Sequence, residues 1–294
     1  MNILSYEHIQ EQKTHGDLKF PFNIYPCSIP LDFAAVPLHW HNDMELICVK
    51  KGQGEISVDL VSHQASEGDI FLVPPGHLHA IRQAEGHSME YENIIFQLSL
   101  LMSSPTDFCS QQFFAPLLQG RSTLPARIST EHPLHAPLAA CLAEIDHYSS
   151  RGDALSTLAI KSRLFELFRL LFSWQKQETN APFASLRPKS LDLVKTIMKY
   201  VENHYGERLT IETMAAVSGF SQSHFMKFFK NTMGVSFIEY LNDYRLTMAA
   251  RLLLASSDAI VAISAECGFE NLSYFNRMFR RKYGVTPSEY RKNP

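Results

Sequence analysis

Apolar and polar residues alternate over short distances in the first third of the chain. Residues 44–49, 54–60, 69–74 and 91–98 are apolar or alternating, and glycine and proline residues separate them. Short segments at such close and regular spacing predict a small antiparallel β-sandwich or β-barrel. We therefore expect β-structure from residue 20 to about residue 100.

The spacing of apolar residues becomes helical from about residue 131. Residues 132–150 and 154–174 carry apolar positions three and four residues apart, which predicts two helices. In the second, a charged residue recurs at every third position from 163 to 169, so the apolar surface covers more than half of the helix. Two interpretations of this surface stay open: it packs on the chain's own barrel, or it also joins two chains. We assign residues 131–175 to a helical dimerisation segment.

A polar stretch with two prolines, residues 176–189, predicts a linker, and residues 190–294 follow as a series of helices. This last region contains an internal repeat. Residues 211–220 (IETMAAVSGF) match 260–269 (IVAISAECGF), and 224–240 (HFMKFFKNTMGVSFIEY) match 274–290 (YFNRMFRRKYGVTPSEY). Each unit reads as a short helix, a Gly-Phe turn and a second helix, which is the pattern of a helix-turn-helix motif.

The second helix of each repeat has an inner aromatic stripe and an outer polar stripe. Phe225, Phe228 and Phe229 form the inner stripe of the first unit, and Phe275 and Phe279 form that of the second. The outer residues that we expect to meet DNA are Ser223, Met226, Lys227 and Lys230, then Leu272, Ser273, Asn276, Arg277 and Arg280. Arginine and asparagine side chains suit guanine and adenine edges, and Lys230, Arg280, Arg281 and Lys282 suit phosphates.

Helix-capping residues mark the ends of these predicted helices. Thr210 and Asp258 are candidate caps of the first helix of each unit, and Ser236 with Glu239 fits a capping box. A single helix from Ser236 to about residue 255 then joins the two units. It would be about 28 Å long at 1.5 Å per residue, which is close to one turn of DNA, about 34 Å.

The charge distribution agrees with a nucleic-acid partner for the C-terminal half. The net charge is −3, but residues 187–294 hold 15 basic and 10 acidic residues, so the acidic excess lies in residues 1–186. The five cysteines include no C-x-x-C pair, a usage that suits a reducing compartment. The first twenty residues lack the apolar core of a secretory signal. We expect a cytoplasmic protein without a membrane partner.

Two segments of the predicted barrel resemble the two cupin motifs. They are HWHNDMELICVKKG (residues 39–52) and GDIFLVPPGHLH (68–79). On an extended strand His39 and His41 point to one side, and Glu45 returns to that side four residues later. With His79 they make a three-histidine, one-carboxylate set suited to a divalent transition metal.

Three interpretations of this set stay open: a metal site, a metal-free polar pocket for a small ligand, or structural histidines. His77 lies two residues from His79 and is an alternative to it. The last motif position, often asparagine in metal cupins, is Gln83.

The segment ISAECGFENLSYFNRMFRRKYGVTPSEYRK (263–292) closely resembles the C-terminal signature of AraC/XylS-type bacterial transcription regulators. This resemblance implies promoter binding through both recognition helices, an N-terminal part that senses an effector and forms a homodimer, and contact with RNA polymerase in an activator. By position it gives the base-facing role to Ser223, Met226, Lys227, Leu272, Ser273, Asn276 and Arg277. Met226 and Leu272 are apolar, so thymine methyl contacts or phosphate contacts matter more there. Sugar-like effectors are favoured by the resemblance, as is a histidine-lined pocket at His39, His41, Glu45 and His79.

The sequence thus predicts a two-domain α+β chain. Residues 1–130 form a cupin-like antiparallel β-barrel with trailing helices, and residues 190–294 form an all-α double helix-turn-helix domain. We expect a DNA-binding transcription regulator rather than an enzyme. The alternative is a metal-dependent cupin enzyme fused to a DNA-binding module.

Overall fold

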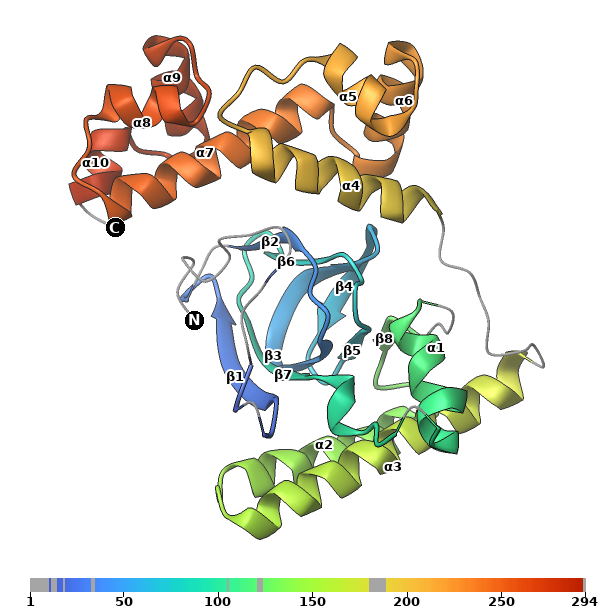
Figure 1. The fold of residues 1–294 in the computed structure, drawn as a ribbon. Helices are drawn as coiled ribbons and strands as arrows, with labels where there is room; N and C mark the ends of the chain where they lie inside the picture. The colour runs from blue at the N-terminus through green and yellow to red at the C-terminus, as the bar shows by residue number, and fades with distance from the viewer. Residues whose placement is uncertain are drawn as a thin grey trace. The chain divides into compact units, whose positions relative to one another are not determined.

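A computed structural model describes residues 11, 15–17, 19–32, 35–104, 106–120, 124–179 and 189–292. The chain divides into two compact units, Met1–Pro188 and Lys189–Pro294. The N-terminal unit contains the predicted antiparallel β-structure followed by helices, and the C-terminal unit is helical (Figure 1). The α+β, two-domain prediction is confirmed.

The β-structure of the N-terminal unit consists of two antiparallel layers that share one strand. Its strands are β1 (Phe22–Ile29), β2 (Ala35–His39), β3 (Met44–Val58), β4 (Val61–Ser66), β5 (Ile70–Val73), β6 (His79–Gln83), β7 (Met89–Phe96) and β8 (Arg127–Ile128). One layer has the order β1-β7-β3-β5-β8, and in the other β3 pairs with β4 and β6, and β6 pairs with β2. The strand β3 therefore belongs to both layers.

The strand β3 differs from the prediction of two separate strands. It runs without a break for 15 residues, with an irregularity in its pairing with β7 between Val49 and Lys51. Gly52 follows this irregularity with a φ of +81°, and a Cβ atom there would collide with the main-chain oxygen of Ser88. The glycine thus bends one strand from the first layer into the second instead of ending it.

Alternate residues of β3 enter two different cores. Ile47 and Val49 lie in the core between the two layers, whereas Leu46 and Cys48 lie in the core that the first layer shares with the helices. Because both faces of the strand are covered, its sequence is a continuous apolar run rather than an alternating one.

The helical part of the N-terminal unit comprises η2 (Leu98–Leu100), η3 (Ser110–Phe114), α1 (Ala115–Leu118), α2 (His135–Ser149) and α3 (Ala154–Thr179). The last two are the predicted helices, and Leu164, Phe168 and Leu171 of α3 are buried against the sheet. The short helices η2, η3 and α1 were not predicted. The helix α3 continues through residues 176–179, the beginning of the predicted linker, and α4 begins at Lys189, its last residue. Residues 180–188 lie outside the described part.

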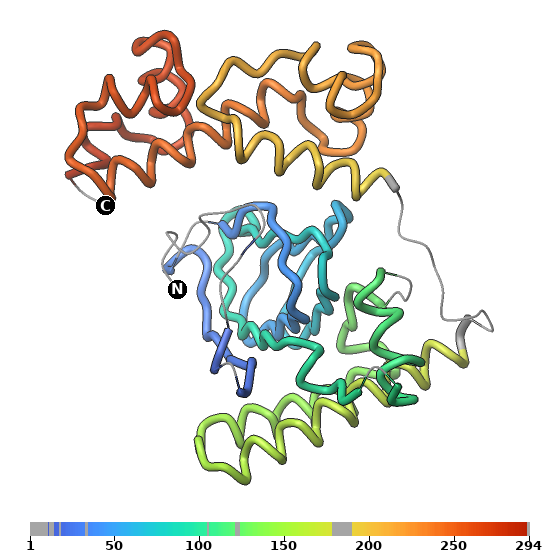
Figure 2. The backbone as a smooth tube through the Cα atoms, viewed as in Figure 1, coloured from blue at the N-terminus to red at the C-terminus, as the bar shows by residue number. Residues whose placement is uncertain are grey.

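The C-terminal unit contains the two predicted helix-turn-helix motifs. Its helices are α4 (Lys189–His204), α5 (Ile211–Ser218), α6 (Gln222–Met233), α7 (Phe237–Ala255), α8 (Ile260–Glu266), α9 (Leu272–Tyr283) and α10 (Pro287–Lys292). Figure 2 shows α7 as the continuous orange segment between the two motifs. Each motif has its own core, and Tyr205 packs against both. No helix in the described ranges is long and apolar enough to cross a membrane.

The capping predictions hold with one exception. The Thr210 hydroxyl accepts a hydrogen bond from the main chain of Thr213, and Ser236 and Glu239 form a complete capping box. Asp258 does not cap α8, because the residue that precedes this helix is Ala259.

Candidate functional site

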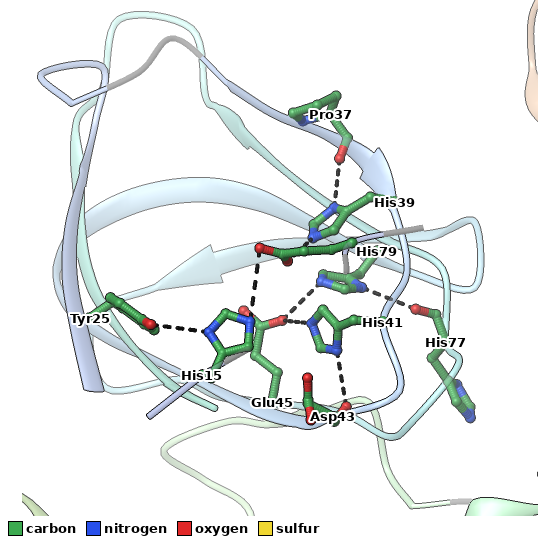
Figure 3. Close-up of polar contacts among 10 residues, drawn as sticks. His15, Tyr25, Pro37, His39, His41, Asp43, Glu45, His77 and His79 are labelled. Carbon is green, nitrogen blue, oxygen red and sulfur yellow. Dashed lines mark hydrogen bonds and ion pairs between the residues drawn. The ribbon is translucent and has the colours of Figure 1, made fainter. Parts of the chain in front are cut away.

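The predicted histidine set is brought together inside the N-terminal unit (Figure 3). His39 ends β2 and His79 begins β6, and the two residues are direct partners in the antiparallel pairing of these strands. His41 follows β2, and Glu45 lies in β3. All four side chains are buried, with relative exposures between 0% and 3%. The barrel therefore gathers these groups from β2, the residues that follow it, β3 and β6 into one buried cluster.

The three imidazole rings of this cluster are oriented in the same way. In each ring the Nδ1 atom lies close to a main-chain carbonyl oxygen two residues away. The distances are 2.9 Å from His39 to Pro37, 3.1 Å from His41 to Asp43 and 3.0 Å from His79 to His77. A carbonyl oxygen only accepts hydrogen bonds, so these contacts place a proton on each Nδ1 and direct Nε2 to other partners. We call His39, His41, His79 and Glu45 the histidine cluster.

Two of the three Nε2 atoms, those of His41 and His79, approach the carboxylate of Glu45. Its Oε2 atom lies 3.0 Å from Nε2 of His41 and 2.9 Å from Nε2 of His79. The candidate ligand atoms of His39, His41 and His79 all lie within 4.8 Å of one another. Three imidazole nitrogens with a carboxylate match the donors that a divalent transition metal prefers.

Burial and charge set the protonation of the cluster. Burial holds the pKa of His39 well below its usual value, and the nearby His79 and His41 act in the same direction. Burial of Glu45 favours the neutral acid, but the charge of His79 and the hydrogen bond from His41 outweigh it and hold the pKa of Glu45 well below its usual value. Burial lowers the pKa of His41, but the hydrogen bond to Glu45 and the charge of Glu45 outweigh burial and raise it. The directions therefore favour an uncharged His39, a charged His41 and an ionised Glu45.

Two buried residues that the sequence reasoning missed lie beside the cluster. The main-chain amide of Glu11 donates a 2.9 Å hydrogen bond to the Trp40 carbonyl. The side-chain Oε2 atom of Glu11 lies 3.7 Å from Nε2 of His39. His15 Nε2 lies 3.9 Å from the other Glu11 oxygen, and His15 Nδ1 lies 3.1 Å from the Tyr25 hydroxyl. Neither residue belongs to a spaced motif, so no local signal in the sequence pointed to them.

Two other residues considered from the sequence lie outside the cluster. The His77 ring forms a 2.8 Å ion pair with Asp59, so His79 and not His77 supplies the third ring. Gln83 is exposed and its side-chain amide donates to the His87 carbonyl. The glutamine therefore does not take the position that asparagine has in metal cupins.

The predicted DNA-facing residues are all exposed on two helices. Ser223, Met226, Lys227 and Lys230 lie on α6, and Leu272, Ser273, Asn276, Arg277 and Arg280 lie on α9. The opposite stripes are buried, with Phe225, Phe229, Phe275 and Phe279 each at 0% exposure. Phe228 was assigned to the inner stripe but is only half-buried, where its ring lies edge-on to Phe220.

The side chains of α9 form a basic, hollowed surface. Asn276, Arg277, Arg280, Arg281 and Thr286 line a hollow of about 510 Å³. The Arg277 guanidinium lies over the Tyr274 ring, 5.4 Å from its centroid, and the Tyr274 hydroxyl accepts a 3.2 Å hydrogen bond from Asn242 of α7. The connecting helix thereby orients the ring beneath Arg277.

Lys282 does not belong to this basic surface, contrary to its predicted role at phosphates. Its ammonium donates to the Asp243 carbonyl and the Thr247 hydroxyl at 2.9 and 2.8 Å, and it pairs with the Asp243 carboxylate at 2.7 Å. The lysine instead holds α9 on α7.

Comparison with known proteins agrees with one site in the N-terminal unit, at the histidine cluster, and another in the C-terminal unit, on α6 and α9. The family model described as an AraC-like ligand binding domain matches residues 32–168, and a helix-turn-helix domain model matches residues 211–293. The chain is an AraC-family transcription regulator. Its N-terminal unit contains the family's ligand-binding domain, and its C-terminal unit is a helix-turn-helix DNA-binding domain.

Relatives of this AraC-family regulator match along nearly their whole length. It is 23% identical to the HTH-type transcriptional regulator YdeC of Bacillus subtilis, over 99% of this chain and 98% of YdeC. It is 24% identical to the transcriptional activator RhaS of Citrobacter koseri, over 93% and 94% of the two chains. The solved structure of ToxT from Vibrio cholerae aligns with 92% of this chain and 94% of its own, at 18% identity and a TM-score of 0.43. The relatives are named as regulators and activators of transcription, not as enzymes, which confirms the expectation.

Proposed function

We propose that this regulator binds promoter DNA through α6 and α9 and that a small molecule bound in its barrel alters that binding. The observation that carries the proposal is the pair of helices with buried phenylalanine stripes and exposed basic stripes, joined by the single helix α7. A recognition helix needs one stripe for its own core and one for the major groove.

The exposed residues divide into two roles. Arg277 and Asn276 suit guanine and adenine edges, and Ser223, Lys227 and Ser273 are polar groups at corresponding places on their helices. Met226 and Leu272 suit thymine methyl groups. Lys230 and Arg280 lie farther along α6 and α9, where contacts to phosphates would fix the position of each helix on the duplex.

The effector site of the proposal is the histidine cluster. His39, His41, Glu45 and His79 offer ring nitrogens and a carboxylate inside a barrel, and such polar groups suit a hydroxyl-rich, sugar-like molecule. A divalent transition metal is the second candidate occupant. It is favoured by the approach of His41 and His79 to Glu45 and by the proximity of the three histidines, and the same four residues would hold it.

The helices α2 and α3 are proposed to join two copies of the chain. Leu155 and Leu158, one turn apart on α3, are exposed by 75% and 67%, and Phe165 by 40%. Replacement of both leucines by glutamate is expected to yield monomers in sedimentation experiments, whereas Thr157→Glu on the same exposed turn retains the dimer. A monomeric wild-type chain at micromolar concentration would refute this part.

The proposal places the regulator in the cytoplasm, where bacterial promoter DNA lies. As an activator, like the relatives named RhaS, it would contact RNA polymerase from the bound promoter.

The decisive experiment measures binding of the purified chain to its own upstream DNA over a series of salt concentrations. We expect steeply salt-dependent binding that Arg277→Ala and Lys227→Ala weaken, each by about 1–3 kcal/mol if the side chain reads a base. The matched control is Arg82→Ala, which removes an exposed arginine of the barrel. Equal binding by all variants, with and without candidate sugars, would contradict the assignment of the two helices.

A further inference from the structure

The side chain of Arg277 lies on an aromatic ring. Its guanidinium carbon lies over the ring of Tyr274, one turn earlier on α9, at 5.4 Å from the ring centroid. A cation and a ring attract each other up to a separation of about 6 Å. Arg277 is exposed, and its guanidinium forms no hydrogen bond or ion pair with any residue that the structure describes. Its N–H donors therefore stay available to DNA while the ring restricts its position.

The Tyr274 ring is itself held by three neighbours. The main-chain amide of Tyr274 donates a 2.8 Å hydrogen bond to the side chain of Asn271, the cap at the start of α9. Its hydroxyl accepts a 3.2 Å hydrogen bond from the side-chain amide of Asn242 on α7. Its ring packs at a tilt on Phe269, with centroids 6.3 Å apart, and Phe269 is buried in the core of the second motif. The ring is therefore attached to the connecting helix as well as to α9.

The first motif is built differently at the corresponding positions. In the internal repeat, His224 corresponds to Tyr274 and Lys227 corresponds to Arg277. The His224 ring stacks on Phe220, with centroids 4.0 Å apart and 30° between the ring planes. Among the described residues no ring lies beneath the Lys227 ammonium, which is a compact charge on a flexible stem. The two recognition helices thus differ in how firmly this side chain is oriented.

We propose that Tyr274 and Asn242 are positioning residues for base reading, which hold the Arg277 guanidinium ready for a guanine edge and make α9 more selective among bases than α6. This inference rests on the proposed function in one respect, that α9 enters the major groove. It adds two residues that need not touch DNA themselves, and it gives the two motifs different roles.

The physical basis is the conformational entropy that DNA binding would otherwise cost. A long, flexible arginine side chain loses rotamer freedom when it is fixed on a base. The Tyr274 ring removes part of that freedom before binding, and the attraction between ring and cation uses none of the N–H donors of Arg277. Guanine alone offers two acceptors, O6 and N7, to such a planar pair of donors. Orientation by the ring therefore favours guanine over other bases instead of strengthening binding to all DNA.

The test is a selection of bound sequences from randomised DNA with the purified full chain. Affinities are then measured for the selected site and for copies with single base-pair changes. We expect one guanine that the wild type prefers by about tenfold and that Arg277→Ala no longer distinguishes. Tyr274→Ala and Asn242→Ala are expected to lower this preference to about threefold, and Tyr274→Phe, which keeps the ring and loses the hydroxyl, to behave like Asn242→Ala.

Two controls show whether the effect passes through Arg277. His224→Ala removes the ring at the corresponding place in the first motif and is expected to leave the guanine preference as in the wild type. Tyr274→Ala added to Arg277→Ala is expected to change base preference no further, because the side chain that the ring positions is already absent.

A spectroscopic readout separates positioning from a merely structural role. In NMR spectra of the DNA-free chain, the ring of Tyr274 is expected to shift the side-chain signals of Arg277. Tyr274→Ala should abolish this shift and Asn242→Ala should reduce it, and urea unfolding identifies any variant that is simply destabilised.

Two results would overturn the proposal while the wild type binds DNA. One is a guanine preference and Arg277 signals that are the same in the wild type, Tyr274→Ala and Asn242→Ala. The other is a loss of affinity by the same factor for every DNA sequence. A wild-type chain that binds no DNA would instead refute the proposed function, and the role of the ring with it.

Discussion

The guanidinium of Arg245 donates a 2.7 Å hydrogen bond to the main-chain carbonyl of Tyr205. The same side chain donates to the Glu207 carbonyl, also at 2.7 Å. Arg245 lies on α7 and the two carbonyls follow α4, so this one residue fastens the connecting helix to the turn before the first helix-turn-helix motif.

Replacement of Arg245 by alanine is therefore expected to destabilise the C-terminal unit. Two carbonyls lose a charged donor, which lowers the free energy of unfolding by about 1–3 kcal/mol. Urea unfolding followed by circular dichroism measures the change. Arg208→Ala, at a nearby exposed position, is expected to leave the midpoint within experimental error, and an Arg245→Ala midpoint equal to that of the wild type would disprove the role of these bonds.

Two basic residues of α9 are expected to give opposite phenotypes. Arg280 is exposed on the outer surface, so Arg280→Ala removes a phosphate contact, lowers the salt dependence of DNA binding by about one ion and leaves stability unchanged. Lys282 is bonded to Asp243 and Thr247, so Lys282→Ala lowers the unfolding midpoint and leaves the salt dependence unchanged. An exchange of these phenotypes between the two variants would reverse the assignments.

Thr286 and Glu289 exchange hydrogen bonds before α10 as Ser236 and Glu239 do before α7, and these two capping boxes predict an acid-sensitive contribution to stability. Hydrogen bonds from Ser236 and Thr286 hold the pKa of Glu239 and of Glu289, respectively, below the usual 4.5. A carboxyl whose pKa is lower in the folded than in the unfolded state stabilises the folded state, and this contribution is complete at pH values above the unfolded pKa. The contribution is lost as the pH falls through the folded pKa. The double variant Ser236→Ala, Thr286→Ala should show a shallower loss of stability in thermal unfolding from pH 5 to pH 3; a slope like that of the wild type would contradict the prediction.

The cysteines are expected to differ sharply in reactivity. Burial raises the pKa of Cys27 to about 11 and those of Cys48 and Cys267 to about 12, and it also raises the pKa of Cys141. Cys109 alone among the five is exposed. Iodoacetamide at pH 8 should thus label Cys109 in the folded chain and all five thiols in urea, as peptide mass spectrometry can determine. Labelling of Cys48 at the rate of Cys109 would show that the thiol is not shielded.

The helical repeat and the histidine cluster were predictable because their signals are local. The phenylalanine stripes fix which face of α6 and α9 is buried, and the cupin spacing places His39, His41 and Glu45 on one side of adjoining extended segments. Each stripe and the spacing of His39, His41 and Glu45 involve residues a few positions apart, where helix and strand periodicity determine direction. His79 came from the second cupin motif, which was recognised by its own spacing.

The sequence-based predictions failed where contacts between residues distant in the sequence determine the structure. Gly52 reads as the end of a strand, yet the approach of Ser88 makes it a bend within β3. Lys282 reads as a phosphate ligand, and only the packing of α9 on α7 reveals Asp243 as its partner. Glu11 and His15 reach the histidine cluster through the fold, so their spacing in the sequence carries no sign of it.

The length of α7 has a rotational consequence as well as a translational one. Each residue of a helix advances the chain by about 1.5 Å and turns it by about 100°. Insertion of one residue into the 19-residue helix would thus swing the entire second motif by more than a quarter of a turn while hardly lengthening the molecule. Natural variation in this helix should accordingly be rich in substitutions and poor in insertions or deletions, since substitutions on its exposed face preserve the relative orientation of α6 and α9.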